Sequence, residues 1–227
     1  MSTDILSLKL GITSSYLIRG SNGIILVDAG TPNKIRSFKR KLARLHIHPE
    51  DIKLIVLTHS HFDHAGSAKD IQDLTGARVV MHEIEKAYFD EDRFAMPKGV
   101  NHMGKISLPV LFPLFKKIRF KKPVIDVVIK NSEFSLKEFG FEGKIYHTPG
   151  HTPGSISLLL NSGEAFVGCQ AHNGLPFRIK PGFPIYAMDI EKVKESWKLL
   201  IERGAKVIFP GHGKSFPVEV IKRKLSE

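Results

Sequence analysis

Three histidines and an aspartate directly follow an apolar run in the stretch Leu54-Ile55-Val56-Leu57-Thr58-His59-Ser60-His61-Phe62-Asp63-His64. Imidazole nitrogens and carboxylate oxygens are the ligands that suit zinc, iron or manganese at a hydrolytic centre. Side chains two positions apart face the same way on an extended chain, so His59 and His61 can reach one ion. Gly66 and the helical pattern after it turn the chain, which directs Asp63 and His64 to a neighbouring position. The stretch therefore predicts a metal site at the end of a buried strand.

The elements that must position this site alternate between strands and helices. Before it, segments within 5–28 have the pattern of strands, and residues 33–45 have the pattern of a basic amphipathic helix. After it, we expect a helix to about residue 74, a strand at 77–81 and a short helix from residue 83. The second half predicts strands at 124–129, 134–139, 144–147, 155–160, 165–167 and 206–209, a helix at 190–203 and a short basic C-terminal helix. This order predicts an α/β fold in which two sheets lie between helical layers.

Length and composition are those of a globular chain. A chain of 227 residues can form one domain with a large core, and no linker or repeat divides it. The single cysteine excludes an internal disulfide framework. The first residues lack the pattern of a signal peptide, and no apolar stretch is long enough to span a bilayer. We therefore expect a cytoplasmic protein without a transmembrane segment.

One segment concentrates the positive charge. Residues 93–125 contain eight Lys or Arg and no Asp or Glu, so they carry +8 of the net charge of +11. Such one-sided charge favours an anionic substrate or partner. Pro109 and Pro113 argue against a regular helix or strand here. We expect an irregular, lid-like insertion with apolar and basic residues, although a plain surface excursion is the alternative.

Two later segments carry further histidines on constrained backbone. They are His147-Thr148-Pro149-Gly150-His151-Thr152-Pro153-Gly154-Ser155 and Pro210-Gly211-His212-Gly213. Together with the His-x-His-x-Asp-His pattern, they make the chain resemble the metallo-β-lactamase-fold hydrolases over nearly its whole length. The resemblance implies a four-layer αββα sandwich over residues 1–227. It also implies one metal held by His59, His61 and His151, a second held by Asp63, His64 and His212, and Asp28 as a group that orients the ligands.

Four other histidines are not expected to bind the metals. His46 and His48 precede Pro49 and are expected to be exposed, His82 is expected to pack or cap a helix, and His147 is expected to be structural.

Cys169 is the departure from the family. Most members place a metal-bridging aspartate at this position, after the strand that matches Ala165-Phe166-Val167-Gly168. A thiolate can serve one zinc ion, whereas a lone cysteine elsewhere is more often a small buried apolar residue. Both readings stay open, and the first predicts two ions with a weaker second site.

The metal chemistry points to hydrolysis by zinc. A di-iron redox centre normally has a glutamate at the position of His61, so His61 favours zinc. Antibiotic-degrading members that carry this cysteine lack a histidine matching His64, commonly have a lysine at the position of His172, and are exported, so β-lactam hydrolysis is not favoured. Zinc lowers the pKa of water so that hydroxide forms near neutral pH, and Asp63 can orient it as a catalytic group.

We therefore expect a zinc-dependent hydrolase of an ester-type bond (phosphodiester, thioester or lactone) in an anionic small molecule. Candidate substrate-binding residues are Phe112, Phe115, Lys116, Lys117 and His172. A nuclease is the alternative, because a basic, aromatic-bearing flap also suits a phosphate backbone. A non-catalytic metal-binding protein of the same fold is the third reading.

Overall fold

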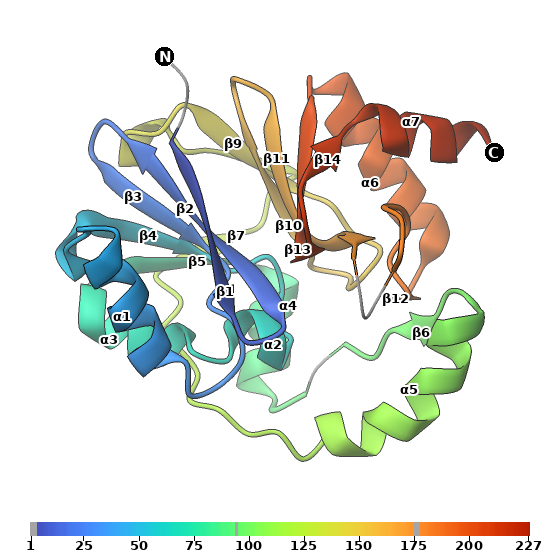
Figure 1. The fold of residues 1–227 in the computed structure, drawn as a ribbon, viewed down its shortest axis with the longest axis horizontal. Coiled ribbons are helices and arrows are strands. Elements are labelled where there is room, and N and C mark those ends of the chain that lie inside the picture. Colours follow the sequence, from blue (N-terminus) through green and yellow to red (C-terminus); the bar gives the residue numbers. More distant parts are fainter. Residues whose placement is uncertain (1–3, 94, 175–177) are drawn as a thin grey trace.

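Two six-stranded sheets form the centre of the computed structural model, which describes residues 4–93, 95–174 and 178–227 (Figure 1). The first sheet has the order β1-β2-β3-β4-β5-β7. Its strands are β1 (Ile5–Leu10), β2 (Thr13–Gly20), β3 (Gly23–Val27), β4 (Ile52–Val56), β5 (Arg78–His82) and β7 (Val127–Ile129). β1, β2 and β3 are antiparallel neighbours, whereas β3, β4, β5 and β7 run parallel. The parallel strands therefore bring their carboxyl ends to one edge of the sheet.

The second sheet has the order β14-β13-β11-β10-β9-β8. Its strands are β8 (Glu133–Ser135), β9 (Gly143–His147), β10 (Ile156–Leu160), β11 (Glu164–Asn173), β13 (Val207–Gly213) and β14 (Phe216–Pro217). β11 and β13 are parallel, with His172 and His212 as register partners. A separate two-stranded pair joins β6 (Lys98–Gly99) to β12 (Tyr186–Ala187).

Three clusters of buried apolar residues hold the two sheets and the helices together. Side chains of both sheets, among them Ile25, Val56, Leu158 and Phe166, pack together between them. The outer face of the first sheet packs on α1 (Ile35–Arg44) and α3 (Ala68–Thr75), and that of the second packs on α6 (Ile190–Glu202) and α7 (Glu219–Ser226). Each of these helices buries one apolar stripe, as an amphipathic helix does. The predicted α/β fold with four αββα layers is confirmed.

Short helical elements complete the chain at the loops. α2 (Phe62–Ala65) follows β4, and α4 (Glu83–Asp90) follows β5. Single 3-10 turns lie at Pro49–Asp51 and Lys137–Phe139. The second of these turns interrupts the strand that we predicted at 134–139, and the strand predicted at 165–167 continues to Asn173. That extension matters because it places Cys169 and His172 within β11.

The expectation of an irregular insertion was wrong for the helix α5 (His102–Phe115), which contains both Pro109 and Pro113. Asn101 caps its start, since its side chain accepts a hydrogen bond of 2.8 Å from Gly104 N. Pro109 and Pro113 are exposed, so water can hydrate the carbonyl groups that lose their helical partner. α5 lies at the bottom of Figure 1, away from the two sheets. Within the described ranges, no helix has the length and apolar character needed to cross a bilayer.

Candidate metal centre

The ends of β3 and β4 position the first group of polar residues. Asp28 follows β3, and His59, His61, Asp63 and His64 follow β4 and enter α2. Because β3 and β4 are parallel neighbours, their carboxyl ends lie side by side. Asp28 has φ of 58°, a conformation that costs little for an aspartate, and this turn directs its carboxylate toward Thr58 and His64.

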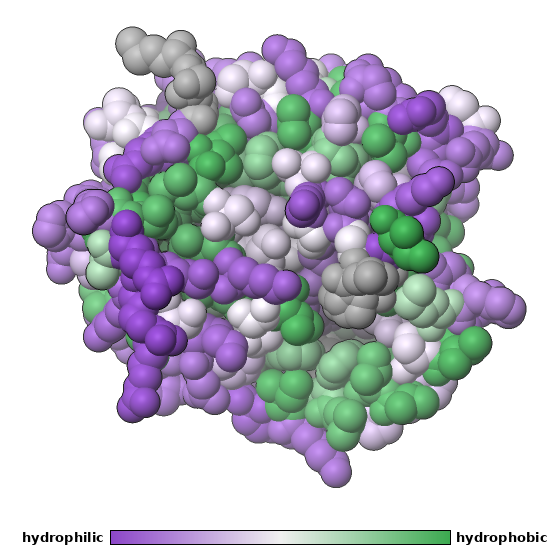
Figure 2. All heavy atoms as spheres, viewed as in Figure 1, coloured by the Kyte–Doolittle hydropathy of each residue, from purple (hydrophilic) through white to green (hydrophobic). Residues whose placement is uncertain are grey.

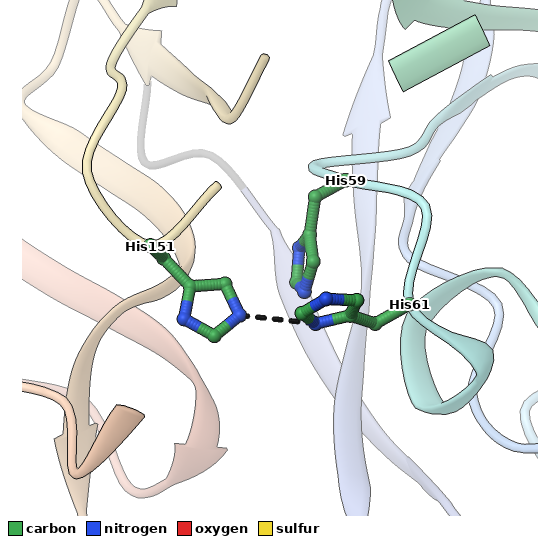
Figure 3. Close-up of side chains that lie close together, drawn as sticks. All are labelled: His59, His61 and His151. Atoms are coloured by element: carbon green, nitrogen blue, oxygen red, sulfur yellow. Dashed lines mark hydrogen bonds between the residues drawn. The ribbon is translucent and has the colours of Figure 1, made fainter. Parts of the chain in front are cut away.

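Opposite them, the loop between β9 and β10 presents His151. Gly150 has φ of 139°, and a Cβ there would lie 2.5 Å from the backbone nitrogen of Val193, so only glycine fits. His151 Nδ1 donates to the Tyr186 carbonyl oxygen at 2.8 Å, which turns Nε2 toward His61. Figure 3 shows the rings of His59 and His61, from the loop after β4, converging with the ring of His151 from the loop between β9 and β10. One ligand atom from each lies within 4.8 Å of the others.

Hydrogen bonds fix which nitrogen of each ring faces this convergence point. The Thr58 hydroxyl donates to Asp28, so it can only accept from His59 Nδ1, 3.0 Å away. His59 Nε2 is then a buried lone pair with no hydrogen-bond partner among the described residues. His61 Nε2 donates to the Ala95 carbonyl oxygen at 2.7 Å, which leaves Nδ1 pointing at His151 Nε2 from 3.1 Å. Lone pairs directed at one another in a buried site fit a shared cation.

A second group lies beside the first. Asp63, His64 and His212 also bring one ligand atom each within 4.8 Å of the others. Asp63 Oδ2 lies 3.1 Å from His212 Nε2 and 3.6 Å from His64 Nε2. Asp28 accepts from His64 Nδ1 at 2.7 Å, and the Ile12 carbonyl oxygen lies 3.1 Å from His212 Nδ1. Both rings therefore present Nε2 to the site, and Asp28 contacts both the ring of His64 and the hydroxyl of Thr58.

Cys169 faces both groups from β11. Its sulfur lies 3.1 Å from His64 Nε2. The sulfur and one ligand atom each of His59 and His64 lie within 4.8 Å of one another, and the same holds for the sulfur with His172 and His212. The β11–β13 register explains the second group, because it pairs His172 with His212. The predicted substrate residue His172 thus lies among the candidate ligand atoms. A glycine at position 211 is required here, since a Cβ would lie 2.5 Å from Cε1 of His64.

Burial and neighbouring charges shift the pKa values of the candidate ligands in different directions. Burial lowers the pKa of His59 and of His61, which keeps both rings neutral and able to donate a lone pair. Burial opposes charge at His212 as well, but the Cys169 thiolate and the Asp63 carboxylate outweigh it and raise its pKa to about 9. The pKa of Asp63 is lowered, because His64 and His212 outweigh the effect of its burial.

Supporting residues that the sequence did not reveal hold the ligand loops together. The buried Glu85 accepts from Ser60 N at 2.8 Å and from Gly154 N at 3.1 Å, and so joins the loop of His61 to the loop of His151. Thr58 and Tyr186 orient His59 and His151 as described above. Nothing in the local pattern of α4 distinguishes Glu85 from an ordinary helix-start residue.

The remaining histidines lie away from the ligand groups. His46 and His48 are exposed, as expected. His82 Nδ1 accepts from Ile84 N at 3.3 Å and so caps α4, and its ring stacks on that of His147 at 4.1 Å. His147 Nε2 lies 2.8 Å from the Pro153 carbonyl oxygen, a contact that ties the ends of the His151 loop together.

A cavity of about 610 Å³ opens over the ligand groups. Leu108, Phe112 and Phe115 of α5 line one wall, and His61, Cys169, His172 and His212 lie at its base. Of the two predicted substrate lysines, Lys116 lines the cavity, with Nζ 4.5 Å from the centre of the Phe112 ring. Lys117 is exposed and is not among the lining residues. Arg119 adds positive charge to the wall, whereas Arg93 and Lys122 line it in ion pairs with Glu91 and Asp92.

The sequence profile of the metallo-beta-lactamase superfamily matches residues 8–212. The chain belongs to this superfamily. A probable metallo-hydrolase of Methanocaldococcus jannaschii is 31% identical over 211 residues, which cover 88% of this chain and 87% of that protein. With the ligand groups above, superfamily membership makes the protein a metal-dependent hydrolase.

Solved structures of the metallo-beta-lactamase superfamily show the same fold. A family member from Thermus thermophilus superposes with a TM-score of 0.68 at 21% identity, over 99% of this chain and 77% of that one. A second structure, solved in a di-iron-bound form, gives a TM-score of 0.67 at 19% identity, over 96% and 97% of the two chains.

Proposed function

We propose that the protein is a zinc-dependent hydrolase that cleaves an ester-type bond of an anionic small molecule. The observation that carries this proposal is the cavity of about 610 Å³, whose base is made of candidate ligands and whose wall is apolar and basic. A volume of this size suits a small molecule rather than a nucleic-acid chain. Phosphodiesters, thioesters and lactones with an anionic group all fit this description.

The ligand set favours zinc. We assign one ion to His59, His61 and His151 and a second to Asp63, His64 and His212, with Cys169 beside both groups. Imidazole nitrogens with a single thiolate are ligands that zinc accepts readily. His172 is a further ligand candidate for the second ion, through its group with Cys169 and His212. Iron is the competing metal, because a structural neighbour was solved in a di-iron-bound form.

The protein's own residues prepare the site for hydrolysis. Bound zinc supplies a Lewis acid that polarises the scissile carbonyl or phosphoryl group and lowers the pKa of water. Asp63, held ionised between His64 and His212, is a hydrogen-bond acceptor that can orient the attacking nucleophile. Phe112 and Phe115 exclude bulk water, and Lys116 and Arg119 neutralise the anionic group of the substrate.

The residues of α5 that line the cavity give it the position of a lid over the metal groups. The face of α5 that packs on the protein makes a polar contact as well as apolar ones, because Ser107 Oγ lies 2.5 Å from the Tyr186 hydroxyl. We also propose a cytoplasmic location, in keeping with a sequence whose single cysteine excludes a disulfide framework.

Metal analysis and a matched substrate panel test the proposal. Metal-depleted protein reconstituted with zinc should hydrolyse at least one anionic phosphodiester, thioester or lactone. It should hydrolyse the neutral analogue of that substrate much more slowly. His61→Ala should lose metal and activity together, whereas His46→Ala, which alters an exposed histidine, should retain both. Reconstitution that succeeds only with iron would reassign the metal. Cleavage of DNA or RNA alone would favour the nuclease, and zinc-loaded protein inert on every substrate would contradict the hydrolase.

A further inference from the structure

The outward face of α5 is apolar although it is exposed. Met103, Ile106, Val110 and Leu114 are 47%, 69%, 69% and 57% exposed. Their spacing of three and four residues places them on one stripe of the helix. Figure 2 shows apolar residues gathered at the lower right, where Figure 1 places α5. Single exposed apolar residues are ordinary, but a continuous stripe on one helix marks an interaction surface.

The other face of the same helix already holds it to the protein. Leu108, Phe112 and Phe115 line the cavity, and Ser107 contacts Tyr186. Gly104 packs tightly, since a Cβ there would lie 2.2 Å from the Ile185 carbonyl oxygen. The outward stripe therefore contributes little to the packing of α5, and its exposure is unfavourable in water.

Lysines border the apolar stripe. Lys117 continues the stripe beyond the end of the helix, and Lys105 starts the adjacent row, which continues through Pro109 and Pro113; all four residues are exposed. Among the described residues, the ion pairs of segment 93–125 are Arg93–Glu91 and Lys122–Asp92, so the lysines of these two rows have no carboxylate partner. The face thus combines an apolar centre with a rim of unneutralised positive charge.

We propose that α5 docks this face onto an anionic lipid surface. Apolar side chains that enter the headgroup region, with lysines that reach toward anionic headgroups, are the features of an interfacial helix. Fourteen residues give a length of about 21 Å, shorter than the apolar core of a bilayer at about 30 Å, so the helix lies in the surface and does not cross it. Docking through this face does not depend on the hydrolytic activity.

Charge and shape disfavour the other occupants. A second copy of the chain would bring two such faces together, each with the unpaired Lys105 and Lys117 and no acidic residue in α5 to offset the repulsion. A nucleic acid would satisfy the lysines but would leave the apolar stripe between them unused. An anionic lipid surface accommodates both parts of the face at once.

Sedimentation with vesicles tests the proposal with the metal-loaded, full-length protein. Binding is compared on phosphatidylcholine vesicles and on mixed phosphatidylcholine–phosphatidylglycerol vesicles. The wild type should bind the mixed vesicles more strongly, and added salt should weaken this binding. Ile106→Ser/Val110→Ser/Leu114→Ser should reduce binding by at least about tenfold, because the buried apolar area drives partitioning. Lys105→Gln/Lys117→Gln should remove the preference for phosphatidylglycerol.

Ile179→Ser is the matched control, because Ile179 is 84% exposed and lies outside α5. It should bind as the wild type does, and the melting temperatures of all variants should agree because every substituted side chain is exposed. Failure of the wild type to bind mixed vesicles, or equal binding by the triple variant, would overturn the proposal. A dimer by light scattering that dissociates in the triple variant, without vesicle binding, would assign the face to a second copy. Binding to duplex DNA without vesicle binding would assign it to nucleic acid.

Discussion

The sulfur of Cys169 lies 3.1 Å from Nε2 of His64, the nitrogen that His64 presents to the second group of metal ligands. Asp28 accepts from the other nitrogen of the same ring, so the ring cannot turn away from the sulfur without breaking that bond. Cys169 is buried, yet its surroundings are imidazoles and not the apolar packing of a core cysteine. This contact favours the interpretation of Cys169 as a metal ligand.

Cys169→Asp should therefore raise the ratio of bound metal to protein, because a carboxylate can bridge two cations. The new carboxylate would face His64 and His212, so its burial is compensated and the melting temperature should change by only a few degrees. The cobalt-loaded wild type should show a thiolate-to-metal absorption band that the variant lacks. A large fall in melting temperature with no gain in metal would show instead that Cys169 serves packing.

Asp28→Asn tests the orienting contact. Asparagine tolerates the positive φ of this position, so the backbone is preserved while the charge that holds His64 and Thr58 is removed. Metal affinity should fall by about 10- to 100-fold, the usual effect of losing a partner of a metal-binding histidine. Competition with a chelator measures the change. Asp126→Asn is the control, since that carboxylate contacts Val79 and Gln72 and should leave the affinity unchanged.

Lys116→Gln should raise KM for an anionic substrate several-fold with little change in kcat, because Lys116 lines the cavity and does not contact the ligand groups. Lys117→Gln is the matched control, because it removes the same charge from the neighbouring residue, which is exposed and does not line the cavity. Steady-state kinetics without lipid should show no effect of Lys117→Gln. Equal effects of the two variants would indicate general electrostatic attraction in place of a specific contact.

His82 predicts acid sensitivity of the fold. Burial is the main cause that lowers the pKa of His82 from 6.5 to about 4, and the charge of His147 is the second cause. Between these values the unfolded chain binds a proton that the folded protein refuses, so stability falls as pH drops from 6.5 toward 4. The loss from this one group reaches at most about 3 kcal/mol. His82→Asn keeps a residue that caps α4 but removes the titration, so its melting temperature should fall less steeply on acidification.

His46→Asn is the control for that measurement, because the His46 ring is exposed. Its melting temperature should follow the wild type from pH 8 to pH 4. Parallel curves for the wild type and His82→Asn would contradict the contribution of His82.

The sequence was sufficient to predict the layered fold, because alternating strand and helix patterns are local and the ligand motifs lie at strand ends. It was not sufficient for α5, because the rule against prolines in helices assumes that the freed carbonyl groups are buried, and those near Pro109 and Pro113 are not. It also missed Glu85, whose role depends on two loops that meet only after folding. The placement of His172 depends on its register with His212, which a sequence pattern does not specify.

The candidate ligands come from both sheets. His59 and His61 follow β4 of the first sheet, whereas His151 precedes β10 of the second. An ion held by all three is therefore a cross-link between the halves of the sandwich, and its binding free energy adds to that of folding. In a cell short of the metal, the protein would be less stable as well as inactive. Proteases would degrade the metal-free protein faster than the metal-loaded form. Abundance of the protein would then follow the supply of its metal.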